Sequence, residues 1–321
     1  MNRDNLEPVK HIKVEKGVKA SELVSRMKEM GFGAEKIARA SEIFLEMIKD
    51  EDCKIFFGLA GAMVPAGMKE IIVDMLRNEY IDVFVVTGAN LTHDLIEALG
   101  NKHYQGTHIV DDGELKDKGI DRIYDVFLKH EVYEDLEIFF EKIFPKLPEK
   151  MNVKEFLWEI GKYVEDENSI LRVCYEKKIP IFCPAIADSG IGAMMWGRLI
   201  QGIDVREKLS KESKVHVDAF DDLREIFDIA WTCKKAAVFY VGGGTPKNFI
   251  QQAMQFSNKL DGASYGIQIT TDREEPGGSS GAPLKEGISW GKMDRKGKYV
   301  NVSCDATIAL PLIYSYVKDK V

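Results

Sequence analysis

Short runs rich in β-branched and aromatic residues alternate with longer segments of helical period along most of the chain. Strands are predicted at residues 54–58, 81–87, 107–110, 179–183, 236–241, 263–270 and 299–304. Helices are predicted at residues 35–49, 68–79, 92–99, 133–144, 153–164, 221–231 and 246–256. Most strand runs are too continuously apolar for a sheet with one wet face. This alternation predicts an α/β, Rossmann-like fold, in which a mostly parallel sheet is covered by helices on both faces.

Length and composition are those of a folded protein with a large core. The chain has 321 residues, of which 45% are hydrophobic, and it contains no internal repeat and no Pro/Ser-rich linker. We therefore expect one catalytic domain over residues 21–321. We expect residues 1–20 to form an N-terminal arm that reaches a neighbouring subunit.

Charge and residue usage argue against several classes of partner. The formal net charge is −8, with 44 basic and 52 acidic residues and no basic block, so neither nucleic acid nor an anionic membrane surface is an expected partner. No apolar run approaches the roughly 20 residues of a membrane helix. The five cysteines form no CxxC pair and the N-terminus carries no apolar signal core, which favours a cytoplasmic protein. The six histidines show no metal-ligand spacing, so no metal site is expected.

Three glycine-containing turns follow predicted strands. They begin at Gly58, Thr87 and Gly242, and none has the GxGxxG or Walker pattern. At the carboxyl ends of parallel strands such turns bind phosphate through helix N-termini, but each is also compatible with a simple tight turn. Asp188 and Asp305 follow two further strands, where a carboxylate accepts ribose hydroxyls or caps a helix.

One lysine stands in a chemically suggestive setting near the C-terminus. Lys292 ends the sequence Ser-Trp-Gly-Lys and lies close to Glu286 and Trp290. An amine, an apolar neighbour that disfavours its ammonium form and a carboxylate are the ingredients of Schiff-base chemistry. The alternative is an ordinary surface lysine after a buried tryptophan. The Gly- and Ser-rich residues 276–283 just before it are interpreted as a lid over a pocket or, alternatively, as a surface loop.

Five motifs together resemble the deoxyhypusine synthase family. They are IFCPAIADSGIG at 181–192, YVGGGTPKNFI at 240–250, GGSSGAP at 277–283, EGISWGK at 286–292 and CDATIALPLI at 304–313. The resemblance spans essentially the whole chain and is strongest over roughly its last 140 residues. It implies an NAD-dependent transferase that moves the aminobutyl group of spermidine through a lysine imine to a lysine of a translation factor of the initiation factor 5A type.

The same resemblance implies roles for individual residues. Lys292 would be the imine-forming lysine, and Glu286 and Trp290 would lie in the amine pocket. The implied NAD-binding residues are Thr87, Gly88, Asp188, Thr271, Asp305 and Ala306. The family forms a homotetramer with active sites at subunit interfaces, so the arm is expected to be an interface element.

Several positions depart from the family pattern. Asn248 stands where the family usually carries a histidine near the proton-transfer step, and Ala193 and Ser279 stand where it usually carries aspartates. Thr92 and His93 replace two glutamates. Because these acids face the ammonium groups of the polyamine, their loss weakens spermidine binding in the usual pose, unless other acids such as Glu274 replace them. We therefore predict a divergent branch in which Asn248 and Ser279 line an altered substrate pocket.

His93 has two interpretations. An imidazole with a pKa near neutrality could replace the missing histidine as an acid or base. Alternatively, His93 is a first-turn helix residue, followed by Asp94, which favours the helix N-terminus.

The expected mechanism leaves three functions open. NAD takes a hydride from the carbon next to an amine, Lys292 captures the resulting imine and releases a smaller amine, and a second amine displaces Lys292 before the hydride returns. The acceptor is either a protein lysine or a small amine, as in a homospermidine synthase-like or agmatine-using enzyme. The third possibility is a non-catalytic NAD-binding homologue.

Overall fold

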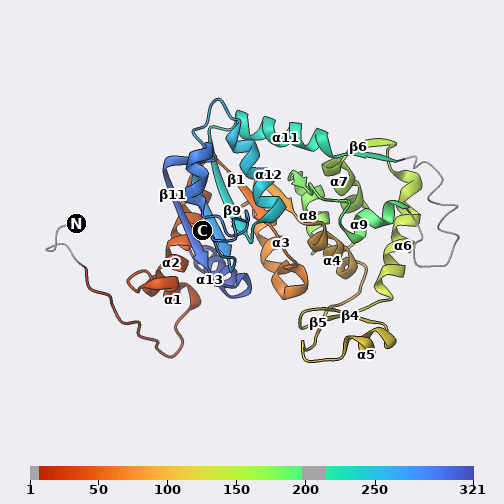
Figure 1. The fold of residues 1–321 in the computed structure, drawn as a ribbon, viewed down its shortest axis with the longest axis horizontal. Helices are drawn as coiled ribbons and strands as arrows, with labels where there is room; N and C mark the ends of the chain where they lie inside the picture. The colour runs from red at the N-terminus through yellow and green to blue at the C-terminus, as the bar shows by residue number, and fades with distance from the viewer. Residues whose placement is uncertain (1–6, 197–214) are drawn as a thin grey trace.

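The computed structural model describes residues 7–196 and 215–321, and its central element is a parallel six-stranded sheet (Figure 1). The order across the sheet is β11–β10–β9–β1–β2–β7, and every neighbouring pair is parallel. The strands are β1 (Cys53–Leu59), β2 (Val83–Val86), β7 (Ile181–Phe182), β9 (Lys235–Val241), β10 (Ala263–Thr270) and β11 (Met293–Ser303). These are six of the seven predicted strands, and the predicted α/β fold class is confirmed.

Both faces of the sheet are buried because its strands are apolar on both sides. In β1, Ile55, Phe57 and Leu59 belong to one hydrophobic cluster, whereas Phe56 belongs to a second cluster on the opposite face. Successive side chains of a strand point to opposite faces, so a continuous apolar run fills two cores at once.

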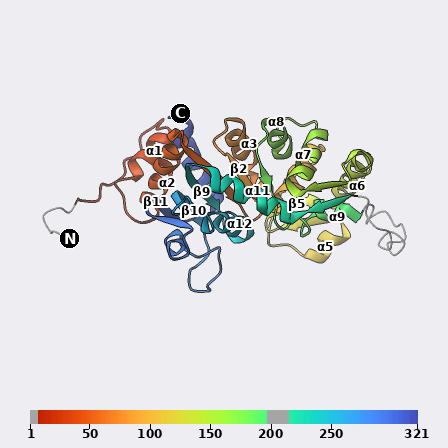
Figure 2. The same cartoon turned by 90° about the horizontal axis from the view of Figure 1, so that it is seen from above.

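Helices pack on both faces. The α-helices are α1 (Ala20–Met27), α2 (Phe32–Lys49), α3 (Lys69–Arg77), α4 (Gly88–Ala98), α5 (Asp112–Asp117), α6 (Val132–Ile143), α7 (Val153–Tyr163), α8 (Ile170–Lys177), α9 (Gly190–Ala193), α11 (Ala219–Thr232), α12 (Gly244–Gln255) and α13 (Ala306–Lys318). Short helical turns are η2 (Val64–Met68), η3 (Phe144–Lys146), η4 (Met194–Trp196) and η5 (Leu284–Trp290). Helices α2 and α13 cover the face that Phe57 joins, and α11 and α12 cover the face that Phe56 joins. In two perpendicular views α1, α2 and α13 gather beside β11, and α6, α7 and α9 lie at the other end of the molecule (Figures 1 and 2).

The strand predicted at residues 107–110 is wrong. A small antiparallel sheet of β3 (Tyr104–Gln105), β5 (Val126–Lys129) and β4 (Ile120–Ile123) lies nearby instead, and residues 107–110 are outside it. Ile109 is 80% exposed, and its backbone N–H donates to Thr107 Oγ1 at 3.1 Å. The apolar run therefore meets no core, and a local side-chain hydrogen bond replaces a strand ladder. This sheet and α5 project as an appendage (Figure 1).

A third, two-stranded sheet pairs β6 (Lys150–Asn152) with β8 (His216–Asp218) in parallel. Residues 7–19 contain no helix or strand and extend beyond α1 in both views (Figures 1 and 2). Within the described ranges, no helix combines the length and the apolar character needed to cross a membrane.

Candidate functional site

The turns that follow β1, β9, β10 and β11 meet at one edge of the sheet, here called the carboxyl edge. They line an open cavity of about 280 Å³. Its lining includes Gly61, Gly242 and Gly243 from the glycine turns and Ser280 from the loop after β10. Gly61 and Gly242 have φ of +68° and +75°, a left-handed conformation that side chains with a Cβ rarely adopt. The glycine residues therefore let the backbone bend into the wall of the cavity.

Three of the six predicted cofactor residues line this cavity. Thr271 follows β10, and Asp305 and Ala306 follow β11. Asp305 also caps α13, since its carboxylate accepts hydrogen bonds from the Thr307 N–H at 2.7 Å and the Thr307 hydroxyl at 2.6 Å. Asp305 thus caps a helix and also lines the cavity, so its position allows both roles that the sequence left open, helix cap and ribose acceptor.

Thr87 and Gly88 lie next to the cavity, at the start of α4. The Thr87 hydroxyl donates to the carbonyl of Gly61, a lining residue, at 2.9 Å. Among the described residues, no side-chain cap is found at the N-terminus of α4, so its first N–H groups have no partner of that kind. A Cβ on Gly88 would lie 2.4 Å from the Ser189 Cβ, so the two turns touch there.

Asp188 precedes that contact by one residue but does not line the cavity. It is exposed, and Ser189 rather than Asp188 caps α9. The alternative role of Asp188 as a helix cap is therefore wrong.

Lys292 lies at the opposite edge of the sheet. Its backbone carbonyl accepts a hydrogen bond from the N–H of Ala263, the first residue of β10, at 3.0 Å, whereas the cavity begins at Ile269 and Thr270. A strand rises about 3.3 Å per residue, so the backbone of Lys292 is about 23 Å from the end of β10. Lys292 is not among the residues that line the described cavity.

The surroundings of Lys292 are more open than expected. Its ammonium lies 5.0 Å from the centre of the Trp290 ring, but Trp290 is 57% exposed and Lys292 is only half-buried. The apolar surroundings expected for Lys292 are therefore not found within the single chain. Glu286 is exposed on η5.

A second lysine, Lys247, was not predicted to be a site residue, and it is only 2% exposed. Burial lowers the pKa of Lys247 to about 8, the charge of Glu286 opposes this shift, and the charge of Lys292 adds to it. These electrostatic effects indicate that the three groups lie near one another. The motif in which Lys247 stands was recognised, but a lysine on a helix resembles a surface residue until its burial is known.

Two of the uncharged replacements, Asn248 and Ser279, are exposed. Asn248 lies on the outer face of α12, and Ser279 lies in the loop after β10, where its backbone carbonyl accepts from Lys247. Thr92, at one of the replaced glutamate positions, is buried: its hydroxyl donates to the Gly88 carbonyl at 2.9 Å and accepts from the Ile191 N–H at 3.2 Å. Thr92 therefore joins α4 to α9.

His93 is buried in a polar network, and it is not among the residues that line the cavity. A ring nitrogen of His93 lies 2.9 Å from one of His103, whose other nitrogen lies 2.7 Å from Glu97. Burial, together with the charge of His103, lowers the pKa of His93 to about 4. A base with such a low pKa is weak at neutral pH, so this environment argues against His93 as the general base.

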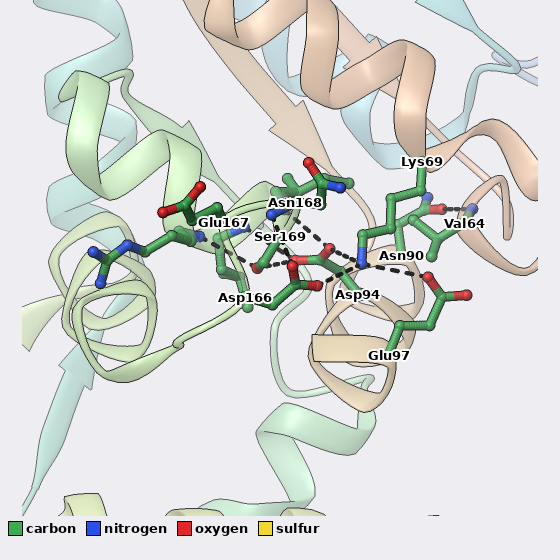
Figure 3. Close-up of polar contacts among 12 residues, drawn as sticks. Val64, Lys69, Asn90, Asp94, Glu97, Asp166, Glu167, Asn168 and Ser169 are labelled. Carbon is green, nitrogen blue, oxygen red and sulfur yellow. Dashed lines mark hydrogen bonds and ion pairs between the residues drawn. The ribbon is translucent and has the colours of Figure 1, made fainter. Parts of the chain in front are cut away.

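Lys69 forms the far end of this network. Its ammonium lies within 3.4–3.5 Å of Asp94, Glu97 and Asp166, and Figure 3 shows the three carboxylates converging on it. Burial opposes the charge of Lys69, but the carboxylates outweigh burial and raise its pKa. Asp94 also accepts from the first N–H groups of α8 at 3.0 Å, so it caps α8 rather than its own helix.

Comparison with known proteins places the chain in a family. The profile described as "DS: Deoxyhypusine synthase" matches residues 22–317. "Probable deoxyhypusine synthase 1" from Methanosarcina acetivorans is 44% identical over 99% of this chain and 97% of its own length. "Probable deoxyhypusine synthase 2" from Archaeoglobus fulgidus is 45% identical over 89% of this chain and 94% of its own length.

Solved structures share the fold. A crystal structure described as a "putative deoxyhypusine synthase" from Entamoeba histolytica superposes with a TM-score of 0.67 at 18% identity, covering 97% of each chain. AgrE in a complex with ornithine and NAD+ superposes with a TM-score of 0.52 at 12% identity, covering 92% of this chain and 35% of AgrE. From the family profile and the two archaeal relatives, we conclude that the chain belongs to the deoxyhypusine synthase family.

Proposed function

We propose that the protein is an NAD-dependent transferase that moves the aminobutyl group of spermidine through an imine on Lys292 to an acceptor amine. Membership of the family supports an aminobutyl transferase. The observation that carries the cofactor assignment is the meeting of Thr271, Asp305 and Ala306 around one cavity at the carboxyl edge. Open parallel sheets bind nucleotides at that edge.

The chemical types of the residues at this edge suit the binding of a dinucleotide. Gly61 and Gly242 bring backbone close to the cavity, and the uncapped N-terminus of α4 among the described residues offers N–H groups to a phosphate. We infer that Asp305 and Thr271 hold ribose or phosphate oxygens, with Thr87 and Gly88 at the adjoining turn. Bound NAD would supply reversible hydride acceptance from the carbon next to an amine.

A second copy of the chain would complete the site. Lys292 stands about 23 Å along the strands from the end of β10, and a lysine side chain cannot span that distance to the cavity of its own chain. We infer that Lys292 of one chain faces the cavity of another in a homotetramer. Burial of the exposed Trp290 at such an interface would also supply the apolar environment that the single chain lacks.

In this assignment Lys292 is the nucleophile, and Glu286 and Trp290 hold the cationic amine. The Lys292 nitrogen bonds to the oxidised carbon of the donor, the bond from that carbon to the departing nitrogen breaks, and 1,3-diaminopropane leaves with the displaced proton. The acceptor amine then replaces Lys292 on the same carbon. We propose a lysine of an initiation factor 5A-type protein as the acceptor and give His93 no proton-transfer role.

A second candidate is transfer to a small amine. It is favoured by the exposed, uncharged side chains of Asn248 and Ser279, where a polyamine ammonium would meet no carboxylate from those positions. Under this alternative the chemistry at Lys292 is unchanged, and only the acceptor differs.

One experiment separates the candidates. The purified protein is incubated with NAD and spermidine labelled in its butyl portion, with and without an initiation factor 5A-type acceptor, and then treated with borohydride. Label on the acceptor supports protein modification, and label in a new small amine supports the alternative. Label retained on the enzyme after borohydride, but lost in Lys292→Ala, supports the lysine imine. NAD binding without any adduct on the enzyme would refute the proposed chemistry.

A further inference from the structure

The ammonium of Lys247 makes a complete set of hydrogen bonds inside the protein. It lies 2.7 Å from the carbonyl of Ser279, 2.6 Å from the carbonyl of Ala282 and 3.0 Å from Gln268 Oε1. An ammonium has three N–H donors and no acceptor, so these three oxygens use all of them. This geometry excludes Lys247 as the imine-forming lysine, because a nucleophilic amine needs a free lone pair.

The two carbonyls belong to the loop of residues 271–283, here called the glycine loop, which contains the residues 276–283 that were interpreted as a lid or as a surface loop. The loop is folded tightly on itself: a Cβ on Gly281 would lie 1.8 Å from the Arg273 carbonyl oxygen. It is also tied to the sheet and to α12. Gln268 Nε2 donates to the Ser280 carbonyl at 2.7 Å, and the Gly244 N–H donates to Ser280 Oγ at 3.0 Å.

The glycine loop connects the two parts of the proposed site. Ser280 lines the cavity at the carboxyl edge, and the loop runs directly into η5, which carries Glu286 and leads to Lys292. Its position therefore affects both the cofactor cavity and the segment of the reactive lysine.

We propose that Lys247 is a positioning residue. Its charged side chain clamps the glycine loop closed against α12 and β10, and thereby fixes the positions of the cavity wall and of the segment that carries Lys292. The proposal rests on the proposed function for its catalytic meaning, but the clamp itself is a property of the protein without substrate. A neutral amine has two N–H groups and a lone pair, and that lone pair would face one of the three oxygens. Loss of the proton therefore turns an attraction into a repulsion.

The clamp should consequently depend on pH. The charged groups that act on Lys247 are Glu286 on η5 and Lys292, and burial makes the largest contribution to its lowered pKa of about 8. The ammonium is present below this value and is lost as pH rises through it. We expect the glycine loop to be closed at pH 7 and to loosen above about pH 8.

Hydrogen exchange on the free protein tests the clamp. Protection factors of the amides at 277–282, which correct for intrinsic exchange rates, are measured from pH 7 to pH 9.5 in the wild type, Lys247→Met, Lys247→Arg and the control Lys285→Met, whose lysine is exposed on η5. We expect at least a tenfold fall in protection with pH in the wild type. Lys247→Met should have low protection at every pH. Lys247→Arg, which stays charged, should show no fall with pH, and Lys285→Met should behave like the wild type.

The outcomes separate the clamp from the proposed chemistry. Wild-type protection of the glycine loop that stays constant to pH 9.5 would overturn the clamp, even if Lys247→Met failed to fold. With the clamp present, Lys247→Met should also weaken NAD binding at least tenfold, because Ser280 lines the cavity. Absence of a lysine imine in the wild type, with a normal pH-dependent clamp, would count against the proposed function alone.

Discussion

Replacing Lys69 with methionine tests the buried charge cluster that joins α3, α4 and α8. Lys69 is 8% exposed and contacts three carboxylates, of which Asp94 is fully buried. At 3.5 Å and an effective dielectric constant of about 20, each contact contributes about 5 kcal/mol before desolvation is subtracted. Methionine keeps most of the volume but leaves the carboxylates facing one another without a cation.

The desolvation of Lys69 and of the acids offsets much of this attraction, so the net loss is smaller than the sum of the contacts. Removing one partner of a buried ion pair costs about 3–5 kcal/mol. Asp94 keeps three other donors, Ser169 Oγ and the N–H groups of Ile170 and Leu171, so we expect the lower end, about 3 kcal/mol. Urea denaturation followed by circular dichroism measures this loss as a lower midpoint at an unchanged slope.

Two variants control the interpretation. Lys177→Met removes an exposed ion pair with Glu79 and should leave the urea midpoint unchanged. Adding Asp94→Asn to Lys69→Met should recover at least about 1 kcal/mol, because the stranded charge is removed. A loss below about 1 kcal/mol in Lys69→Met would contradict the reasoning, because it would mean that the cluster is solvated in solution.

Three further outcomes are expected. Gly243→Ala would place a Cβ 2.4 Å from the Ser280 Cα and should weaken NAD binding at least tenfold by calorimetry, whereas Gly33→Ala, with no atom within 4 Å, should leave it unchanged. Burial raises the pKa of Asp222 to about 7, so between about pH 4 and pH 7 the folded state holds a proton that the unfolded state has released. Stability is therefore lost as pH rises through this window, and Asp222→Asn should flatten that slope in urea titrations; an unchanged slope would show that other groups cause it. His93→Gln should reduce borohydride-trapped adduct less than tenfold, and a reduction of a hundredfold or more would restore His93 as a catalytic candidate.

Much of the fold could be predicted because buried parallel strands must be apolar on both faces. The runs that became β1, β9 and β10 satisfy this rule along most of their length, and each is followed by a turn that lines the cavity. The run at 107–110 looks alike locally, but it lies on an exposed appendage. Helix α13 was missed because Pro311 lies within it, and a proline usually ends a helix.

The chemical types present in the site, together with the family motifs, could be read from the chain by itself: glycine turns after strands, acids near them, and a lysine beside a tryptophan. Their arrangement was decided by tertiary structure. The register of β10 against β11 sends Thr271 and Asp305 to one edge and Lys292 to the other, and the packing of α12 buries Lys247 under the glycine loop. The physical reason is that spacing along the chain specifies local conformation, whereas strand register and burial determine which distant residues come into contact and which charged groups are desolvated.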